Sequence, residues 1–284
     1  EYLRNRIKNK QTEVVVDLQN KLKKFNLNTV CQSARCPNLG ECFVKGTATF
    51  MILGTVCSRN CRFCNVDSGT TEKVNPDEPG NISIMVRDLG LKHVVITSVT
   101  RDDLEDQGAG QFIKTVNEIK RLNPEVTTEI LVPDFGGDIE LLESVLEIPV
   151  AVFNHNIETI ERLYPVARPQ AVYKRSLNVL KLASQFKGRI FFIKSGFMTG
   201  LGESEEEIHE LMQDLFNAGV EILTIGQYLR PSLKHLEVKK YYLDDEFEKL
   251  QRIGEKIGFK KVFSGPFVRS SFNSGNILNE LKGI

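Results

Sequence analysis

The chain has 284 residues, a length at which a single large α/β unit is common, and we favour one main unit with one core. Lysine plus arginine and aspartate plus glutamate both total 37, so the formal net charge is zero and no basic field favours nucleic acid or an anionic membrane. No apolar stretch approaches the roughly 20 residues that cross a bilayer, and the first ten residues contain no signal-peptide core. We therefore expect a soluble monomer whose partners include neither nucleic acid nor a membrane.

Short apolar or β-branched runs alternate with segments of helical spacing along most of the chain. The runs predict six strands, at residues 47–53, 93–98, 127–132, 150–153, 190–195 and 221–226. The segments between them predict helices at residues 81–90, 109–122, 138–147, 172–186 and 204–218. The last of these helices begins with a capping box formed by Ser204 and Glu207. Such alternation predicts a parallel sheet with right-handed crossovers, and both an open doubly wound sheet and a full or partial barrel are compatible with it.

The two ends of the chain read as extensions packed on this core. Residues 1–46 contain one amphipathic helix, at about 12–25, and three of the cysteines. Residues 231–284 add a helix at 244–257 and a short strand at 260–263. We therefore divide the chain into an N-terminal extension (1–46), a core (47–230) and a C-terminal extension (231–284).

Polar and glycine-rich loops follow every predicted strand of the core. They lie at residues 54–65, 99–110, 133–138, 154–159, 196–204 and 227–232. In parallel α/β folds the ligand binds at the carboxyl ends of the strands, so these loops should surround one site. The first loop carries three cysteines, which places them in that site.

All six cysteines lie within 34 positions, at Cys31, Cys36, Cys42, Cys57, Cys61 and Cys64. Disulfides suit small secreted domains, whereas the 220 residues after Cys64 contain no cysteine. A zinc ribbon would show paired CxxC units, and the only CxxC here joins Cys61 to Cys64. Two iron–sulfur clusters fit the pattern better, while zinc stays an alternative.

Three cysteines stand at Cys57-x3-Cys61-x2-Cys64, and three thiolates bind three corners of a 4Fe-4S cube while one iron stays open. This motif, with Phe63 before its last cysteine, resembles the signature of the radical S-adenosylmethionine (SAM) superfamily. The resemblance implies a partial parallel (β/α)6 TIM-like barrel of the radical SAM type. It also implies that SAM binds the open iron and that one electron converts it to a 5′-deoxyadenosyl radical.

The other three cysteines, Cys31-x4-Cys36-x5-Cys42, resemble the auxiliary-cluster motif of the lipoyl synthase family. Similar segments continue along essentially the whole chain. They are "CPNLGECF", "GTATFMILG", "VVITSVTRDDL", "LVPDF", "VFNHNIET", "KSGFMTGLGE", "LTIGQYL" and "GPFVRSS".

The resemblance implies a sulfurtransferase that inserts two sulfur atoms, at C6 and C8 of an octanoyl chain bound to a lysine of a carrier protein. Two SAM molecules supply the radicals and an auxiliary 4Fe-4S cluster supplies the sulfur. The implied partners are an octanoylated lipoyl-carrier domain or glycine-cleavage H protein, a low-potential electron donor of ferredoxin or flavodoxin type, and iron–sulfur assembly or carrier proteins.

The resemblance also implies site residues. The auxiliary cluster is expected to be held by Cys31, Cys36 and Cys42, with Ser271 as its fourth ligand. The SAM-binding cluster is expected to be held by Cys57, Cys61 and Cys64. These last three cysteines and Ser271 are the expected catalytic residues. The chain departs from the family beside this serine, where Phe272 and Asn273 replace the usual Tyr and His. Loss of a phenol hydroxyl removes a hydrogen bond of about 1 kcal/mol, which is a modest change.

Five further residues are candidates for SAM contact. Ser98, Asn154 and Lys194 stand at strand ends, where the family places groups that hold the methionyl and ribose parts, while Phe63 and the backbone of Tyr228 would flank adenine.

The remaining polar residues of these loops have simpler explanations. We expect His155 to be a polar residue with its hydrogen bonds satisfied beside the barrel mouth. The pair Asp102 and Asp103 should orient Arg101 or cap a helix, because radical chemistry needs no paired general acid and base.

Other functions remain open at this point. They are another radical SAM sulfur-insertion enzyme, a divergent paralogue of lipoyl synthase, a non-catalytic two-cluster electron carrier and a zinc-binding interaction protein. Reduced cysteines favour the cytoplasm, or an organelle matrix if a leader precedes Glu1.

Overall fold

The computed structural model describes residues 13–33, 38, 47–188, 191–271 and 274–275. Its main sheet contains the strands β1 (Asn28–Thr29), β2 (Thr47–Ile52), β5 (His93–Ser98), β6 (Thr127–Leu131), β7 (Val152–Asn154), β8 (Phe192–Thr199), β9 (Ile222–Gln227) and β10 (Lys261–Gly265). A separate pair consists of β3 (Val56–Cys57) and β4 (Asp67–Ser68). The α-helices are α2 (Glu13–Lys24), α3 (Val30–Ser33), α5 (Glu78–Asp88), α6 (Ala109–Leu122), α7 (Ile139–Leu146), α8 (Tyr164–Ala167), α9 (Tyr173–Gln185), α10 (Glu205–Asn217) and α11 (Asp244–Ile257). Two 3-10 turns are η1 (Phe135–Gly137) and η2 (Glu161–Leu163).

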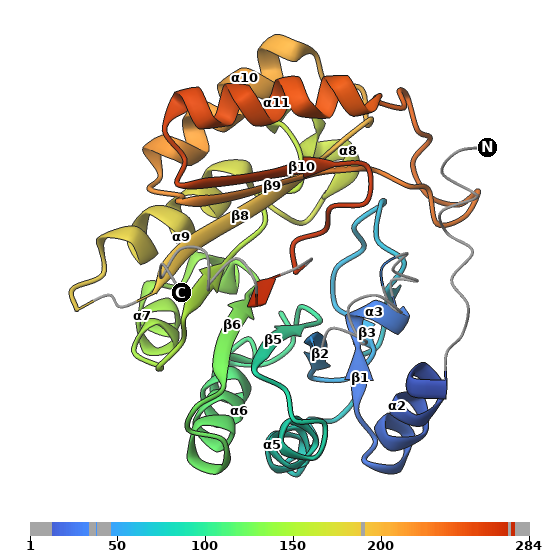
Figure 1. The fold of residues 1–284 in the computed structure, drawn as a ribbon, viewed down its shortest axis with the longest axis vertical. Helices are drawn as coiled ribbons and strands as arrows, with labels where there is room; N and C mark the ends of the chain where they lie inside the picture. The colour runs from blue at the N-terminus through green and yellow to red at the C-terminus, as the bar shows by residue number, and fades with distance from the viewer. Residues whose placement is uncertain (1–12, 34–37, 39–46, 189–190, 272–273, 276–284) are drawn as a thin grey trace.

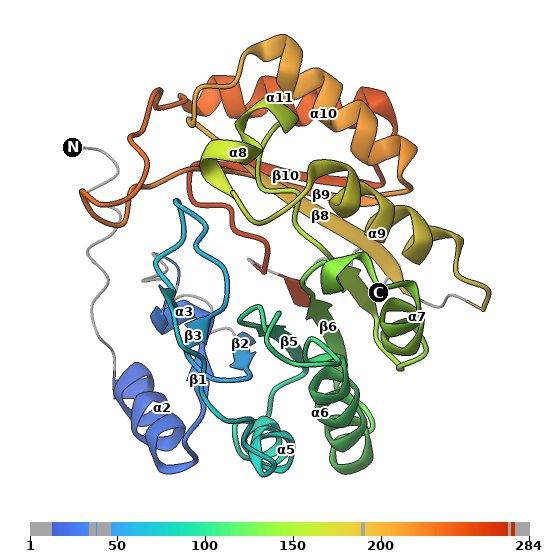
Figure 2. The same ribbon diagram turned by 180° about the vertical axis from the view of Figure 1, so that it is seen from behind.

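The strand order identifies the sheet as a partial barrel. The order is β1-β2-β5-β6-β7-β8-β9-β10, and each strand from β5 onward is parallel to the strand before it. A doubly wound sheet reverses its order at a switch point, and no reversal occurs here, so the open doubly wound alternative is wrong. Among the described residues β2 and β10 do not pair with each other, and the barrel is therefore partial. Figures 1 and 2 show the curved sheet with its helices on the outside.

The six predicted core strands are present, and the shifts in their ends have physical causes. The largest shift is in β8, which was expected to end at residue 195 but continues to Thr199. Its register with β9 continues from Lys194 opposite Ile222 to Thr199 opposite Gln227. Gly196 permits this close pairing, because a Cβ at that position would collide with the hydroxyl of Thr224. The glycine therefore lies inside a strand rather than in a loop.

The apolar core lies between the sheet and the helices. Val94 and Ile96 of β5 are fully buried, and so are Phe112 and Val116 of α6, which are spaced by one helical turn. The interior of the barrel is different, because several of its side chains are polar or charged. Buried polar side chains such as Glu129, Asn154 and Lys194 therefore stand on the strands beside this apolar core.

The short elements β1, β3, β4, α3 and α8 were not predicted, because two to four residues show no periodicity. The C-terminal helix α11 and the strand β10 occur close to where the sequence predicts them. β10 lies in the main sheet, parallel to β9, with Lys261 opposite Ile222. Its Val262 packs against Gly254 of α11, where a Cβ would come too close.

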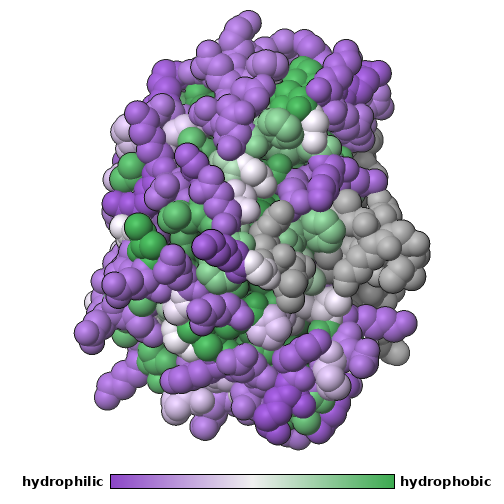
Figure 3. Space-filling model, turned by 90° about the vertical axis from the view of Figure 1, so that its left-hand side faces the viewer, coloured by the Kyte–Doolittle hydropathy of each residue, from purple (hydrophilic) through white to green (hydrophobic). Residues whose placement is uncertain are grey.

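The described surface carries mostly polar side chains. On the face shown in Figure 3, hydrophilic residues are interspersed with scattered apolar areas. In the part of the chain that the structure describes, no helix is long and apolar enough to span a membrane.

The capping box predicted at the start of α10 is confirmed. Ser204 Oγ accepts the Glu207 N–H (3.2 Å), and Glu207 Oε2 accepts the Ser204 N–H (2.8 Å). Replacing Ser204 with alanine should lower the free energy of unfolding by about 1 kcal/mol, because an N–H of the first turn loses its acceptor. Urea unfolding of the two proteins measures this difference. Ser204→Thr keeps a hydroxyl acceptor, so its free energy of unfolding should fall by no more than about half as much as that of Ser204→Ala. Equal losses in both variants would contradict a capping role.

Candidate active site

The cysteine loop lies between β3 and β4, directly after β2, at the rim formed by the carboxyl ends of the strands. Backbone N–H groups point at two of its sulfurs. Cys57 Sγ accepts from the N–H of Arg59 (3.4 Å) and of Thr100 (3.3 Å), and Cys64 Sγ accepts from the N–H of Val66 (3.4 Å). Such N–H donors at cysteine sulfurs are typical of iron–sulfur sites, where they help to set the reduction potential.

The thiols of this loop are shielded from water. Burial raises the pKa of Cys64 to about 12. Burial also raises the pKa of Cys61, although the positive charge of Arg168 opposes it. A coordinating metal removes the thiol proton outright, so these groups suit iron ligation better than free thiolate chemistry.

Thiols are the candidate metal donors of this loop. The described cysteines of the loop are Cys57, Cys61 and Cys64, and none of them is in a disulfide. Among the described residues, no three His, Cys, Asp or Glu side chains converge as the ligands of one metal ion do. Thiolates that bind different irons of a cube stand farther apart than ligands of one ion.

The cysteine loop is held from several sides by backbone contacts. Its neighbours are the loop after β5, the segment after α8 and the segment after β9. The contacts are Ser58 N–H to Thr100 O (3.0 Å), Asn60 N–H to Gln170 Oε1 (3.1 Å), Arg62 N–H to Ala167 O (2.9 Å), Leu236 N–H to Arg62 O (3.1 Å) and His235 Nε2–H to Cys64 O (2.9 Å). These contacts with the rim therefore fix the shape of the loop.

Side chains of the loop after β5 also hold it, in part as expected. Asp103 binds Arg101 through Nε and Nη2 (2.8 to 3.2 Å), so this aspartate orients Arg101 as predicted. Asp102 does not. It forms a bidentate pair with Arg59 of the cysteine loop (2.8 and 2.7 Å), so the expectation for Asp102 is wrong. The local sequence could not reveal this pair, because the two residues are 43 positions apart.

The N-terminal cysteine segment lies beside the cysteine loop. Cys31 is buried in α3, while Cys36 and Cys42 lie outside the described residues. Asn65, next to Cys64, donates from Nδ2 to Ser33 O (2.7 Å). The two cysteine-bearing segments are therefore neighbours.

The chain after β10 turns back toward the barrel mouth, as both ribbon views show (Figures 1 and 2). Asn38, between Cys36 and Cys42 in sequence, donates from Nδ2 to Phe267 O (2.6 Å). A Cβ at Gly226 of β9 would collide with Val268 O, so the glycine permits this close approach. The structure thus brings the C-terminal serine motif to the N-terminal cysteine segment.

The two serines of the motif differ in their contacts. Ser270 Oγ accepts from Asn154 Nδ2 (2.7 Å) and donates to Asn156 Oδ1 (2.9 Å). Ser271 is half-buried. Phe272 and Asn273, where the chain departs from the family, lie outside the described residues.

A buried ion pair crosses the barrel interior. Lys194 of β8 and Glu129 of β6 are both 1% exposed, and Lys194 Nζ lies 3.0 and 3.2 Å from the two carboxylate oxygens. Asn154 of β7 also donates to Glu129 Oε1 (2.8 Å). Two of the predicted SAM-contact residues, Asn154 and Lys194, are therefore brought together, with Glu129, which the sequence did not single out, as their common partner.

Three buried polar atoms at the rim have no hydrogen-bond partner among the described residues. They are Ser98 Oγ, Asn154 Oδ1 and His155 Nε2. The prediction for His155 is therefore half right, because Nδ1 donates to Val132 O (2.8 Å) while Nε2 is unsatisfied. Burial lowers the pKa of His155 to about 4, so the ring is neutral. Buried unpaired polar atoms are rare, and such a group at a strand rim fits a polar ligand such as SAM.

The two residues predicted to flank adenine lie on either side of this rim. Phe63 is half-buried in the cysteine loop. Tyr228 is buried after β9, where its N–H donates to Thr199 O (2.8 Å) and its hydroxyl to Leu236 O (2.9 Å).

The loop after β7 adds residues that the sequence did not single out. Glu158 has a positive φ of 69°, which is strained for a non-glycine residue. Its carboxylate accepts from Asn156 Nδ2 (3.0 Å), and it lies close enough to Cys61 and Cys64 to affect their pKa values. The strained backbone, which no spacing rule reveals, turns this carboxylate toward the thiols.

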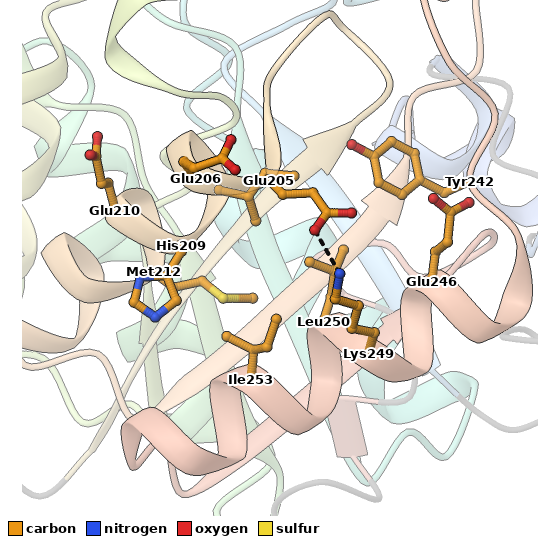
Figure 4. Close-up of a pocket in the computed structure, with 11 residues that line it drawn as sticks. Glu205, Glu206, His209, Glu210, Met212, Tyr242, Glu246, Lys249, Leu250 and Ile253 are labelled. Carbon is orange, nitrogen blue, oxygen red and sulfur yellow. Dashed lines mark hydrogen bonds and ion pairs between the residues drawn. The ribbon is translucent and has the colours of Figure 1, made fainter.

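Two clefts lie outside the barrel. One, of about 550 Å³, borders the cysteine loop and is lined by residues that include Ala167 and Leu236. The other, of about 390 Å³, lies between α10 and α11, where Lys249 bridges to Glu205 (Figure 4). Its acidic lining belongs to the outer helical layer, and none of the predicted site residues borders it.

Comparison with known proteins gives a consistent result. The family model of the radical SAM superfamily matches residues 51–215. The lipoyl synthase of Caldanaerobacter subterraneus subsp. tengcongensis is 53% identical over 262 residues, which is 92% of this chain and 92% of that protein. The lipoyl synthase of Alkaliphilus metalliredigens is 52% identical over 259 residues, which is 91% of this chain and 89% of that protein.

Solved structures share the fold at much lower identity. Methylornithine synthase has a TM-score of 0.57 at 14% identity, covering 99% of this chain and 96% of its own. The FeFe-hydrogenase maturase HydG from Carboxydothermus hydrogenoformans has a TM-score of 0.56 at 14% identity, covering 96% and 78%. These likenesses show a common architecture.

The buried ion pair gives a testable prediction. Lys194→Met leaves the Glu129 carboxylate buried without its partner, so the free energy of unfolding should fall by about 3 to 5 kcal/mol. Urea unfolding of the reconstituted protein measures the loss. Adding Glu129→Gln removes the unpaired charge and should recover most of it. A double variant no more stable than Lys194→Met would show that the pair does not act as a unit.

Proposed function

This chain belongs to the lipoyl synthase family of the radical SAM superfamily, and from that membership we propose which residues hold its cofactors and which proteins it works with. It is a sulfurtransferase that inserts sulfur at C6 and C8 of a protein-bound octanoyl chain, and its cofactors are SAM and 4Fe-4S clusters. Family membership rejects the electron-carrier and zinc-protein alternatives.

We propose that Cys57, Cys61 and Cys64 hold the cluster that binds SAM. The support is their position on one loop at the rim, with N–H donors at two sulfurs and Arg168 beside Cys61. When bound, the cluster supplies the electron that cleaves SAM to a 5′-deoxyadenosyl radical. The chain's own part is to orient SAM and exclude water.

Five residues are proposed to contact SAM. Ser98, Asn154 and Lys194 would hold its polar methionyl and ribose parts, and Phe63 and the Tyr228 backbone would flank adenine. The unsatisfied Oγ of Ser98 and Oδ1 of Asn154 support the first two. Lys194 is already paired with Glu129. An anionic group of SAM that contacts Lys194 would therefore also lie near the Glu129 carboxylate.

The auxiliary cluster is proposed to be held by Cys31, Cys36, Cys42 and Ser271. The single observation that carries this proposal is the hydrogen bond from Asn38 to Phe267 O (2.6 Å), which joins segments 229 positions apart. Asn38 lies inside the cysteine motif, and Phe267 is four residues before Ser271. The Asn65 to Ser33 contact then sets this cluster beside the SAM-binding one. Such proximity suits transfer of sulfur to a carbon radical formed at the rim.

The chain divides, in this proposal, into the extension 1–46 with the auxiliary cysteines, the barrel 47–230 and the extension 231–284 with Ser271. It acts on lipoyl-carrier proteins in general. We propose an octanoylated carrier domain or H protein as the substrate, a ferredoxin or flavodoxin as the electron donor, and iron–sulfur carrier proteins for cluster repair. We propose the cytoplasm, where thiols stay reduced, as its compartment, because iron–sulfur clusters need reduced cysteines.

Anaerobic turnover tests the function and the two cysteine sets together. The reconstituted chain should contain about eight irons and, with SAM and a reductant, should convert octanoylated H protein to a product with two added sulfur atoms, as mass spectrometry reports. Cys61→Ala should keep about four irons and release no 5′-deoxyadenosine. Cys31→Ala should also keep about four irons but still release 5′-deoxyadenosine without adding sulfur. An unchanged octanoyl mass with the wild-type chain would reject the function, and identical defects in both variants would reject the division of the cysteines.

The proposed serine ligand has a matched control beside it. Ser271→Ala should lower the rate of sulfur insertion at least tenfold, while the first release of 5′-deoxyadenosine changes less than threefold, because only the auxiliary cluster loses a ligand. Ser271→Cys restores an iron-binding side chain and should recover auxiliary iron content. Ser270→Ala loses the bonds to Asn154 and Asn156, worth about 1 kcal/mol each, and should retain sulfur insertion. The reverse pattern in the two alanine variants would assign the ligand to Ser270.

A further inference from the structure

Arg59 is a buried charge in a loop that otherwise lies near the surface. Its side chain is 7% exposed, although it stands only two residues after Cys57. Its Nε and Nη2 donate to the two oxygens of Asp102 (2.8 and 2.7 Å), and Nη2 also lies 2.7 Å from Oδ1 of Asp134. A bidentate pair with a further carboxylate fixes both the position and the orientation of a guanidinium.

The network around Arg59 is balanced in charge. Asp134 is 1% exposed, and its other oxygen faces Arg175 (3.3 Å). Burial by itself raises the pKa of Asp134, but hydrogen bonding and attraction from Arg59 outweigh it and hold the pKa at about 2. Two carboxylates and two guanidinium groups therefore stay charged together, so the network keeps its geometry at neutral pH.

Both N–H donors to the Cys57 sulfur depend on this network. One is the backbone N–H of Arg59 itself, and the other belongs to Thr100, two residues before Asp102. Ser58 closes the link, because its Oγ donates to Asp102 Oδ2 (2.9 Å) and its N–H donates to Thr100 O (3.0 Å). The guanidinium thus fixes the two backbone segments whose N–H groups meet at one sulfur.

We propose that Arg59 is a positioning residue for the SAM-binding cluster. By locking the cysteine loop to Asp102 and Asp134, it holds two N–H donors on the Cys57 sulfur and so sets how readily the cluster accepts an electron. Hydrogen bonds to the sulfurs stabilise the more negative, reduced cluster and raise its reduction potential. The proposal rests on ligation by Cys57, Cys61 and Cys64, which iron content in the Cys61→Ala variant tests separately.

A redox titration separates positioning from simple charge. In the reconstituted full-length chain, the EPR signal that changes on adding SAM identifies the SAM-binding cluster. Arg59→Gln and Asp102→Ala each break the lock but change the local charge in opposite directions. If positioning dominates, both should lower the ratio of reduced to oxidised cluster about tenfold at a fixed solution potential, a shift of about 59 mV for one electron. A charge acting through space would instead move Asp102→Ala the other way.

The control is Arg62→Gln, which removes the same charge from an exposed position in the same loop and should change the ratio less than threefold. Unchanged titrations in Arg59→Gln and Asp102→Ala, or an upward shift in Asp102→Ala, would overturn the proposal. If Arg59→Gln loses iron, it should lose only the SAM-binding cluster, keeping about four irons and an unchanged circular dichroism spectrum, and this result supports a local role. Equal loss of both clusters contradicts it. Substitution of Asp102, whose side chain is 39% exposed, should disturb folding less than substitution of the buried Arg59. If Arg59→Gln does not fold, the titration of Asp102→Ala therefore decides between positioning and charge.

Discussion

The parallel pairing of β2 through β10 in sequence order is the constraint on which the site depends. Because every neighbouring pair is parallel and no reversal occurs, the carboxyl ends of the strands form one continuous rim. The cysteine loop follows β2, Ser98 ends β5, and Asn154 ends β7, so residues far apart in sequence meet there. Among the described strands the sheet ends at β1, which pairs with β2, and at β10, and the segment before β2 meets the segment after β10 where Asn38 contacts Phe267. The open side therefore gives both ends of the chain access to the rim.

Two sets of buried charges in the barrel are paired with opposite charges. Glu129 and Lys194 neutralise each other in the interior, and Arg59 and Arg175 neutralise Asp102 and Asp134 at the rim. Buried ion pairs contribute little net stability. They also occupy positions that apolar side chains fill in other barrels, so the barrel loses the stability of that apolar packing. The fold compensates in the outer layer, where apolar strand residues such as Ile96 pack against the helices. What the interior gains is a set of fixed dipoles and charges around a polar ligand.

The local pattern of the chain predicts the fold well and the site only in part. Strands, helices and the capping box depend on residues within one turn or a few positions, and cysteine spacing depends on a single loop, so periodicity and spacing reveal them. The contacts of the site join distant positions. Arg59 meets Asp102 across 43 positions, and Asn154 meets Ser270 across 116, with no local signature at either end. The strained φ of Glu158 and the passage of β8 through Gly196 likewise follow from neighbours in space. The sequence therefore predicts which loops surround the site, but not which side chains within them touch.

The two cysteine segments differ in how strongly the protein shapes them. The loop from Cys57 to Cys64 is fixed by a bidentate arginine pair, a buried carboxylate and several backbone contacts, all formed by the chain itself. In the N-terminal segment, β1 pairs with β2 before Cys31, and neutral amide hydrogen bonds run from Asn65 to Ser33 O and from Asn38 to Phe267 O. A neutral hydrogen bond contributes about 1 kcal/mol, and charge-assisted bonds contribute roughly twice that. The loop from Cys57 to Cys64 is thus held by charge-assisted as well as neutral hydrogen bonds, whereas the described bonds of Asn65 and Asn38 are neutral.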